Sequence, residues 1–149
     1  MTILVLCITS FYRYLGMEED KDILSDFIST YRDSIQRIAE APQSVDCQSD
    51  FAINSVLAGR YSDAKLAFNK YDKLMLESEI SVKQKDEFYI FLVAYAKAKM
   101  HQKLGEKDLT CKYWRAAKDD ADIFIRLRGR LSAFEDFVHE TQYQAVWCR

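Results

Sequence analysis

Three groups of polar residues are spaced in ways that suit binding of a metal ion or an anion. His139 follows Asp136 by three residues and Glu135 by four, so their side chains share one face if the segment is helical. A carboxylate and a histidine at this spacing form half of the di-iron site of helical bundles, but such a site needs a second copy and further glutamates, which the sequence does not show. We therefore interpret this group as a surface ion pair and expect no metal and no cofactor.

The other two groups precede it in the chain. Three aspartates occur within residues 119–122, but adjacent positions of a helix point about 100° apart, which favours a solvated helix face over a magnesium site. Arg126 and Arg130 are four residues apart, and arginine suits bidentate contacts to phosphate or carboxylate. Because the net charge is −2 and no nucleic-acid motif is present, we expect carboxylates of a partner or of the chain itself, and not nucleic acid.

Known catalytic motifs are absent from the sequence. It has no nucleophile elbow and no Walker-type or dinucleotide-binding glycine loop. His101 and His139 are its only histidines, so a general base would have to be one of them or a carboxylate. We predict that the protein is not an enzyme. An enzyme would require a polar pocket around one of these two histidines.

The composition indicates an all-α protein. Of the 149 residues 49% are apolar, and one proline with four glycines is too few for the many turns of an all-β fold. We expect residues 17–149 to form a single helical domain, preceded by an N-terminal extension of residues 1–16. Residues 17–46 carry eight acidic and three basic side chains, whereas residues 97–130 carry ten basic and five acidic ones. Either the two regions face each other or simply form solvated faces, or the basic one meets an acidic partner.

The cysteines and the first residues of the chain indicate the cellular compartment in which we expect the protein. Cys7, Cys47, Cys111 and Cys148 show no C-x-x-C spacing, which does not support a zinc site. The apolar run Ile3–Ile8 is too short to span a membrane, and it lacks the basic flank and cleavage site of a secretory signal. We predict a cytoplasmic protein with reduced thiols, in which Cys7 and Cys111 are small core residues, and we keep a secretory signal as the alternative.

Apolar residues recur at three- and four-residue steps, which predicts about six helices in antiparallel hairpins and no strands. The first helix ends near Pro42, because proline cannot continue a helix, and residues 43–49 are expected to form a polar loop. A central hairpin follows over residues 51–77. Gly59 is expected in its turn and Ser62 at the N-cap of its second helix.

Two long apolar stripes complete the chain. Asp86 is expected to open a helix that Gly105 ends, after a polar bridge over residues 78–85 that reads as loop or helix extension. An unbroken helix over residues 108–145 would be roughly 55 Å long at 1.5 Å per residue, which exceeds what a domain of this size can cover. We therefore expect a break near Gly129.

Two blocks share a pattern of a small residue, a turn glycine and a large aromatic. In each, the alanine precedes the glycine by seven residues and the aromatic follows it by nine: Ala52, Gly59 and Phe68, then Ala98, Gly105 and Trp114. This pattern resembles the tetratricopeptide repeat, in which small residues let two antiparallel helices approach and an aromatic fills the gap. The resemblance covers residues 48–117 at most. Because the glycines are 46 residues apart and the family's repeat is about 34, an irregular helical bundle is the alternative.

The resemblance implies a concave groove that binds a peptide or an amphipathic helix of another protein. The residues that it places on the groove are Ile53, Val56 and Leu57 from the first block and Tyr95, Lys99, Gln102 and Lys103 from the second. A groove with apolar residues on one wall and lysines on the other would suit an acidic helix. In the alternative, Tyr95 is part of the core and the lysines are ordinary exposed residues.

The predicted function is that of a non-catalytic adaptor or chaperone-like module that binds another protein. The second candidate is an immunity or antitoxin-type inhibitor that blocks a toxin through the acidic helix within residues 17–46. Tyr12, Tyr14, Tyr143 and Trp147 lie near the chain ends, where the apolar pattern does not require burial. These aromatics predict either a binding surface, a homodimer included, or termini that pack on each other.

Overall fold

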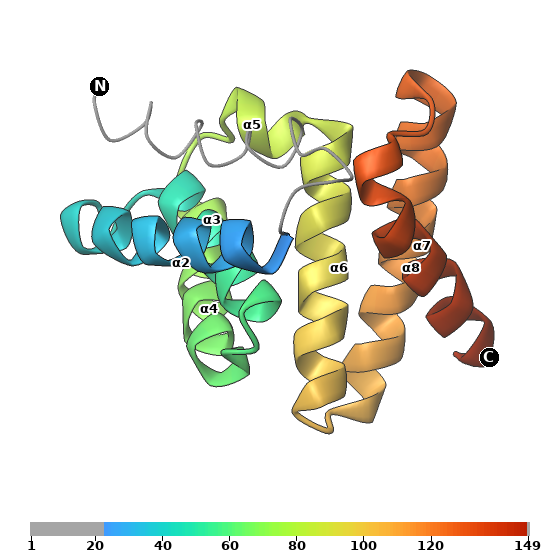
Figure 1. The fold of residues 1–149 in the computed structure, drawn as a ribbon. Coiled ribbons are helices and arrows are strands. Elements are labelled where there is room, and N and C mark those ends of the chain that lie inside the picture. The colour runs from blue at the N-terminus through green and yellow to red at the C-terminus, as the bar shows by residue number, and fades with distance from the viewer. Residues whose placement is uncertain (1–22, 149) are drawn as a thin grey trace. The chain divides into compact units, whose positions relative to one another are not determined.

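The computed structural model describes residues 23–148, except for the side chains of residues 23–30 and of Ala133. Over that range the chain forms seven α-helices, one short 3-10 helix and no strand (Figure 1), so the predicted all-α fold is confirmed. The contacts divide the chain into two compact units with a boundary between Gln84 and Lys85. The predicted extension, residues 1–16, lies outside the described residues.

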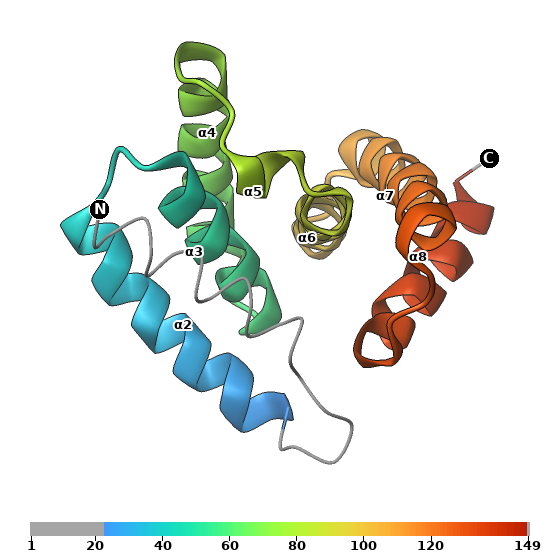
Figure 2. The ribbon, with the colours of Figure 1, turned by 90° about the horizontal axis from the view of Figure 1, so that it is seen from above.

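The first unit contains three long helices and one short one. They are α2 (Ile23–Glu40), α3 (Val45–Leu57), α4 (Tyr61–Glu77) and α5 (Val82–Lys85). α2 packs on α3 and α3 packs on α4, in the order that Figure 2 shows. Because α3 has a helix on each side, ten of its 13 residues are buried.

The prediction of a polar loop over residues 43–49 was wrong, because α3 begins at Val45. The hydroxyl of Ser44 caps the helix by accepting a hydrogen bond from the backbone N–H of Cys47 at 3.2 Å. The first turn of α3 has no apolar periodicity because its polar side chains are buried instead of solvated. A pattern read from hydrophobicity alone cannot distinguish such a turn from a loop.

α2 ends at Glu40, before Pro42, as the sequence predicted. Its inward face differs from the predicted apolar stripe, because Ile35 is exposed whereas Ser34 and Arg37 are buried. Buried polar side chains are stable only when they are hydrogen-bonded or paired. Ser34 meets this condition by donating to the carbonyl of Tyr31 at 2.7 Å.

The predicted hairpin with Gly59 in its turn is confirmed in α3 and α4. Gly59 has a φ of +78°, a conformation that residues with a Cβ rarely adopt, and the N–H groups of residues 58–60 bond carbonyls in the last turn of α3. The predicted N-cap was wrong. α4 begins at Tyr61, and Ser62 lies inside its first turn.

The second unit contains α6 (Glu87–Lys103), α7 (Lys107–Arg128), the 3-10 helix η1 (Ser132–Phe134) and α8 (Glu135–Trp147). Asp86 opens α6 as predicted, because its carboxylate accepts from the N–H groups of Phe88 and Tyr89 at 3.0 and 3.2 Å. Glycines with positive φ follow α6 and α7 at Gly105 and Gly129, so both predicted ends are confirmed.

Aromatic rings fill the interior of the second unit. Phe88 of α6 contacts Phe134 of η1 at a ring-centroid distance of 4.2 Å and Phe124 of α7 at 5.5 Å. Tyr95, two turns along α6, contacts Trp114 of α7 at 5.6 Å and Phe137 of α8 at 4.9 Å. Since such pairs add about 0.5–1.5 kcal/mol each beyond their burial, this packing fixes how α8 lies on the hairpin of α6 and α7.

Replacement of Gly105 by alanine tests the conformational origin of the α6–α7 turn. No atom lies within 4 Å of the Cβ position and φ is +77°, so the cost is conformational and not steric. We expect Gly105→Ala to lower the free energy of unfolding by about 1–2 kcal/mol in denaturant titrations. Gly105→Asn should lose less, because asparagine adopts this region more readily. An alanine variant as stable as the parent would contradict this explanation.

Candidate functional site

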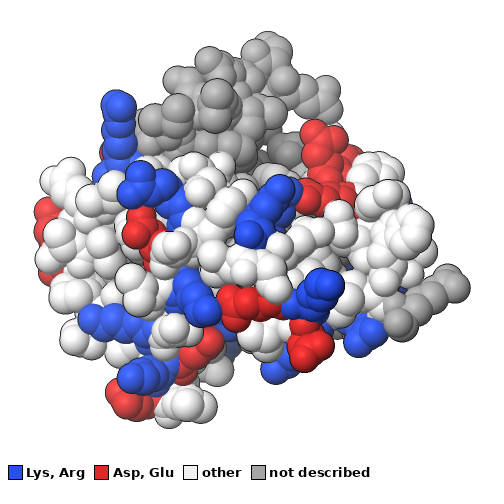
Figure 3. Space-filling view, turned by 90° about the horizontal axis from the view of Figure 1, so that it is seen from below, with Lys and Arg blue, Asp and Glu red and all other residues white. Residues whose placement is uncertain are grey.

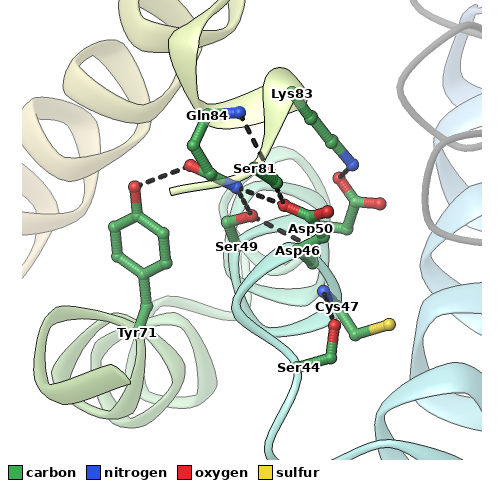
Figure 4. Close-up of polar contacts among 9 residues, drawn as sticks. All are labelled: Ser44, Asp46, Cys47, Ser49, Asp50, Tyr71, Ser81, Lys83 and Gln84. Carbon is green, nitrogen blue, oxygen red and sulfur yellow. Dashed lines mark hydrogen bonds and ion pairs between the residues drawn. The ribbon is translucent and has the colours of Figure 1, made fainter. Parts of the chain in front are cut away.

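The first unit contains a buried polar cluster that joins α5 to α3 and α4 (Figure 4). This α3–α5 cluster comprises Asp46, Ser49, Asp50, Tyr71, Ser81, Lys83 and Gln84. Gln84 lies at its centre: its amide nitrogen donates to Asp46 at 2.9 Å and to the hydroxyl of Ser49 at 3.0 Å. Its amide oxygen accepts from the hydroxyl of Tyr71 at 2.8 Å, so the amide is bonded at both ends.

An ion pair forms the second half of the cluster. The ammonium of Lys83 lies 2.5 Å from a carboxylate oxygen of Asp50, and the two side chains are only 3% and 1% exposed. Burial lowers the pKa of Lys83 below its ordinary value of 10.5, although Asp50 opposes the shift. The folded state therefore binds fewer protons here than the unfolded state, so this group's contribution to stability rises as pH increases from the lowered pKa toward 10.5.

Tyr71 is perturbed in the opposite direction from Lys83. Burial raises the pKa of its phenol, and the carboxylates of Asp72 and Asp46 raise it further. Perturbed ionisable groups in a cleft often mark an active site, but the side chains of Lys83 and Tyr71 are buried. The arrangement instead fixes α5 to α3, across 33–38 residues of sequence.

A double-mutant cycle on Lys83 and Asp50 tests this structural role. We expect Lys83→Met and Asp50→Leu each to lower the free energy of unfolding by about 3–5 kcal/mol, because each breaks a buried ion pair. The double variant should lose less than the sum, because it removes both charges. The exposed pair Lys118–Asp122, at 3.2 Å, is the control and should couple by less than about 1 kcal/mol. Additive losses at Lys83 and Asp50 would contradict the pairing.

The groove residues predicted from the first block lie mostly inside the first unit. Ile53 and Val56 are buried core residues of α3, and Leu57 is half-buried at its end. They contribute to packing of α3 between its neighbours. Little of their surface is left for a partner.

The residues predicted from the second block lie on α6, and three of the four contact α8. The hydroxyl of Tyr95 donates to Glu140 at 2.6 Å, and the ammonium of Lys99 pairs with the other oxygen of the same carboxylate. Gln102 donates to the side chain of Gln144 at 3.1 Å. Lys103 is exposed. The chain's own α8 therefore occupies the positions that the sequence assigned to a partner helix.

Some of the other polar residues singled out in the sequence form close polar contacts within the second unit. His139 lies 3.4 Å from Glu135, which also pairs with Arg130 at 2.9 Å, and Arg128 pairs with Asp86 at 2.9 Å. In the described part of the chain no three histidine, cysteine or acidic side chains are grouped to hold a metal ion.

The outward side of α8 carries an exposed apolar surface, which we call the α8 face: Tyr143, Val146 and Trp147. These side chains are 62%, 54% and 71% exposed, and the rings of Tyr143 and Trp147 contact each other at 6.1 Å. The opposite side of the same helix is buried through Val138 and Thr141. α8 therefore has two apolar sides, of which only one is covered.

A disulfide fixes the end of α8. Cys148, directly after the helix, is bonded to Cys111 of α7, with a Cα–Cα distance of 5.2 Å. The guanidinium of Arg115 donates to the backbone carbonyl of Cys148, at 2.8 Å from its Nε. Cys47 is also disulfide-bonded. The prediction of reduced thiols was therefore wrong for these three cysteines, because their spacing in sequence gives no indication of their proximity.

Removal of the Cys111–Cys148 bond tests how strongly it holds α8. The bond closes a loop with a sequence separation of 37, for which chain entropy gives about 3–4 kcal/mol. We expect Cys111→Ser and Cys148→Ser each to lower the free energy of unfolding by about this amount, as measured by the fluorescence of buried Trp114 in denaturant. The double variant should match the single ones, because all three lack the same bond. Unchanged stability would contradict this role.

Comparison of the chain with models of known protein families, with curated proteins and with solved structures gave no match. The tetratricopeptide resemblance stays a prediction. Within the described residues, no helix is long and apolar enough to cross a membrane.

Proposed function

We propose that this chain is a non-catalytic protein-binding module and that its second unit binds a partner through the α8 face. The observation that carries the proposal is the exposure of Tyr143, Val146 and Trp147 on a helix whose other side is held in place. Tyrosine and tryptophan dominate binding hot spots because they bury a large area with few rotatable bonds. A rigid helix that presents them loses little entropy on binding.

The surface that we propose for binding lies on α8, whereas the sequence predicted a surface on α6. Tyr95, Lys99 and Gln102 of α6 already bond to α8, so a partner helix would have to displace it. The α8 face requires no such rearrangement. Non-catalytic binding is also favoured because Lys83 and Tyr71, whose pKa values are shifted from their ordinary values, are buried.

The disulfides support a site of action in an oxidising compartment. Such bonds persist in secreted and periplasmic proteins and are rare in the cytosol, where glutathione and thioredoxin reduce them. Cys47, Cys111 and Cys148 are all bonded. We therefore propose an oxidising compartment in place of the cytoplasm predicted from the sequence.

The inhibitor function has no comparable support. It would use the acidic helix within residues 17–46, of which residues 17–22 lie outside the described part of the chain. Asp46 is buried and accepts hydrogen bonds from Ser81 and Gln84. Its carboxylate is therefore bonded to other side chains inside the first unit.

Site-specific photo-crosslinking tests the proposed surface. A benzophenone amino acid replaces Trp147 in one variant and Leu127 in another, since Leu127 is similarly exposed, at 60%, on α7 of the same unit. In the native source we expect a discrete product from position 147 and none from position 127. Excess unlabelled chain should suppress the product, whereas excess Trp147→Ser chain should not. Identical products from both positions, or none from position 147, would refute the proposal.

A further inference from the structure

Lys83 places its amine against a carboxyl group inside the first unit. Its Nζ lies 2.5 Å from Oδ1 of Asp50, and the two side chains are only 3% and 1% exposed. Because a carboxyl oxygen is bonded directly to its carbon, the nitrogen is close to the separation of about 3–3.5 Å from which an attack on that carbon begins. A nucleophile and an electrophile therefore face each other in a site that is closed to bulk water.

The residues on either side of Lys83 are bonded to α3, which holds the amine in place. The hydroxyl of Ser81 donates to Asp46 at 2.8 Å, and the amide nitrogen of Gln84 donates to the same carboxylate at 2.9 Å. Figure 4 shows these side chains converging, with those of Lys83 and Asp50, between α5 and α3. The main chain of α5 therefore has little freedom to withdraw Lys83 from Asp50. Such positioning is a large part of what accelerates a reaction between two bound groups.

The surroundings of Lys83 favour the neutral amine, which is the nucleophilic form. Burial lowers the pKa of its ammonium; the carboxylates of Asp50 and Asp46 oppose this shift, and the positive charge of Arg37 on α2 adds to it. Burial disfavours the charged form of a carboxyl group as well. Transfer of one proton from Lys83 to Asp50 removes both charges. It leaves an amine and a carboxylic acid, which are the two reactants of an amide bond.

We propose that the side chains of Lys83 and Asp50 join in an intramolecular amide bond, so that this buried pair is a site of self-modification. Nζ of Lys83 attacks Cγ of Asp50, and a C–N bond forms. One C–O bond of Asp50 then breaks, and its hydroxyl leaves as water with a proton from the nitrogen. Nothing is oxidised or reduced, and no co-reactant is needed. Because the site is closed to bulk water, the amide is protected from hydrolysis.

Other contacts between lysine and carboxylate in the described residues are more exposed to water. Lys99 contacts Glu140, but these side chains are 26% and 27% exposed, and Tyr95 donates to the same carboxylate, which stabilises its charged form. Lys118 and Asp122 lie 3.2 Å apart and are 46% and 56% exposed. Figure 3 shows one face of the molecule on which basic and acidic side chains lie beside one another at the surface. Water keeps such groups charged, so we expect the amide only at the buried pair.

Mass spectrometry of the full-length chain tests the proposed bond. The native, disulfide-bonded chain is incubated at about pH 8, where more of the amine is neutral than at lower pH. It is then denatured and its disulfides are fully reduced, so that any remaining loss of mass comes from another covalent change. We expect a mass lower than the sequence mass by one water molecule. Trypsin does not cut at an acylated lysine, so residues 38–60 and 74–85 should appear as one branched peptide.

Two variants and a matched control identify the reacting groups. Lys83→Arg keeps the positive charge, but a guanidinium does not give up its proton, so we expect this variant to have its full sequence mass. The same is expected of Asp50→Leu, which lacks the carboxyl group. Lys118→Arg, in the exposed pair, should still lose one water. Fragmentation of the branched peptide locates the bond in the parent chain itself, so the test does not depend on the folding of a variant.

A parent chain that keeps its full sequence mass after incubation would overturn the proposal. So would a loss of water that persists in Lys83→Arg, as a cyclic imide at an aspartate would produce. A branched peptide that joins Lys83 to a carboxyl group other than that of Asp50 would also contradict it. None of these results depends on the α8 face, which lies in the second unit and is tested by crosslinking.

Discussion

The contact of η1 and α8 with the aromatic residues of α6 determines what the second unit can present. Phe134 lies against Phe88 with ring centroids 4.2 Å apart, and Phe137 lies against Tyr95 at 4.9 Å. These rings orient α8, so Glu140 and Gln144 reach the polar side chains of α6. The same orientation turns Tyr143 outward. The surface proposed for binding is therefore a consequence of packing on the opposite side of the helix.

The two units use different interiors. The second is aromatic and follows the usual rule that apolar side chains are buried, whereas the first encloses an ion pair and an amide that is bonded at both ends. Hydrogen bonds and ion pairs between buried polar groups contribute little net stability, but a different position of α5 would leave these groups buried without hydrogen bonds. The α3–α5 cluster therefore selects one position of α5 over others. In this way it fixes the end of the first unit.

The sequence predicted those features of the fold that depend on local backbone requirements. Helices end at or just before Pro42, Gly59, Gly105 and Gly129, and each of these ends was identified from the sequence. Proline ends a helix because it lacks a backbone N–H donor, and glycine does so because it readily adopts a positive φ. The start of α3 was missed because its polar residues bond to partners more than 30 residues away. The Cys111–Cys148 disulfide and the packing of α8 on α6 were missed because they too join residues far apart in sequence. The periodicity of apolar residues identifies the buried face of a helix, but not which element packs against that face.

The Cys111–Cys148 bond limits the effect of a protease cut in the second unit. Arg128 and Arg130 flank the exposed turn between α7 and η1, and they are suitable cleavage sites for an enzyme that cuts after arginine. A cut at either position lies inside the covalent ring that the disulfide closes. The fragment that bears Tyr143 and Trp147 would stay attached to α7 and keep most of its packing. A nicked molecule would thus retain the surface that we propose for binding.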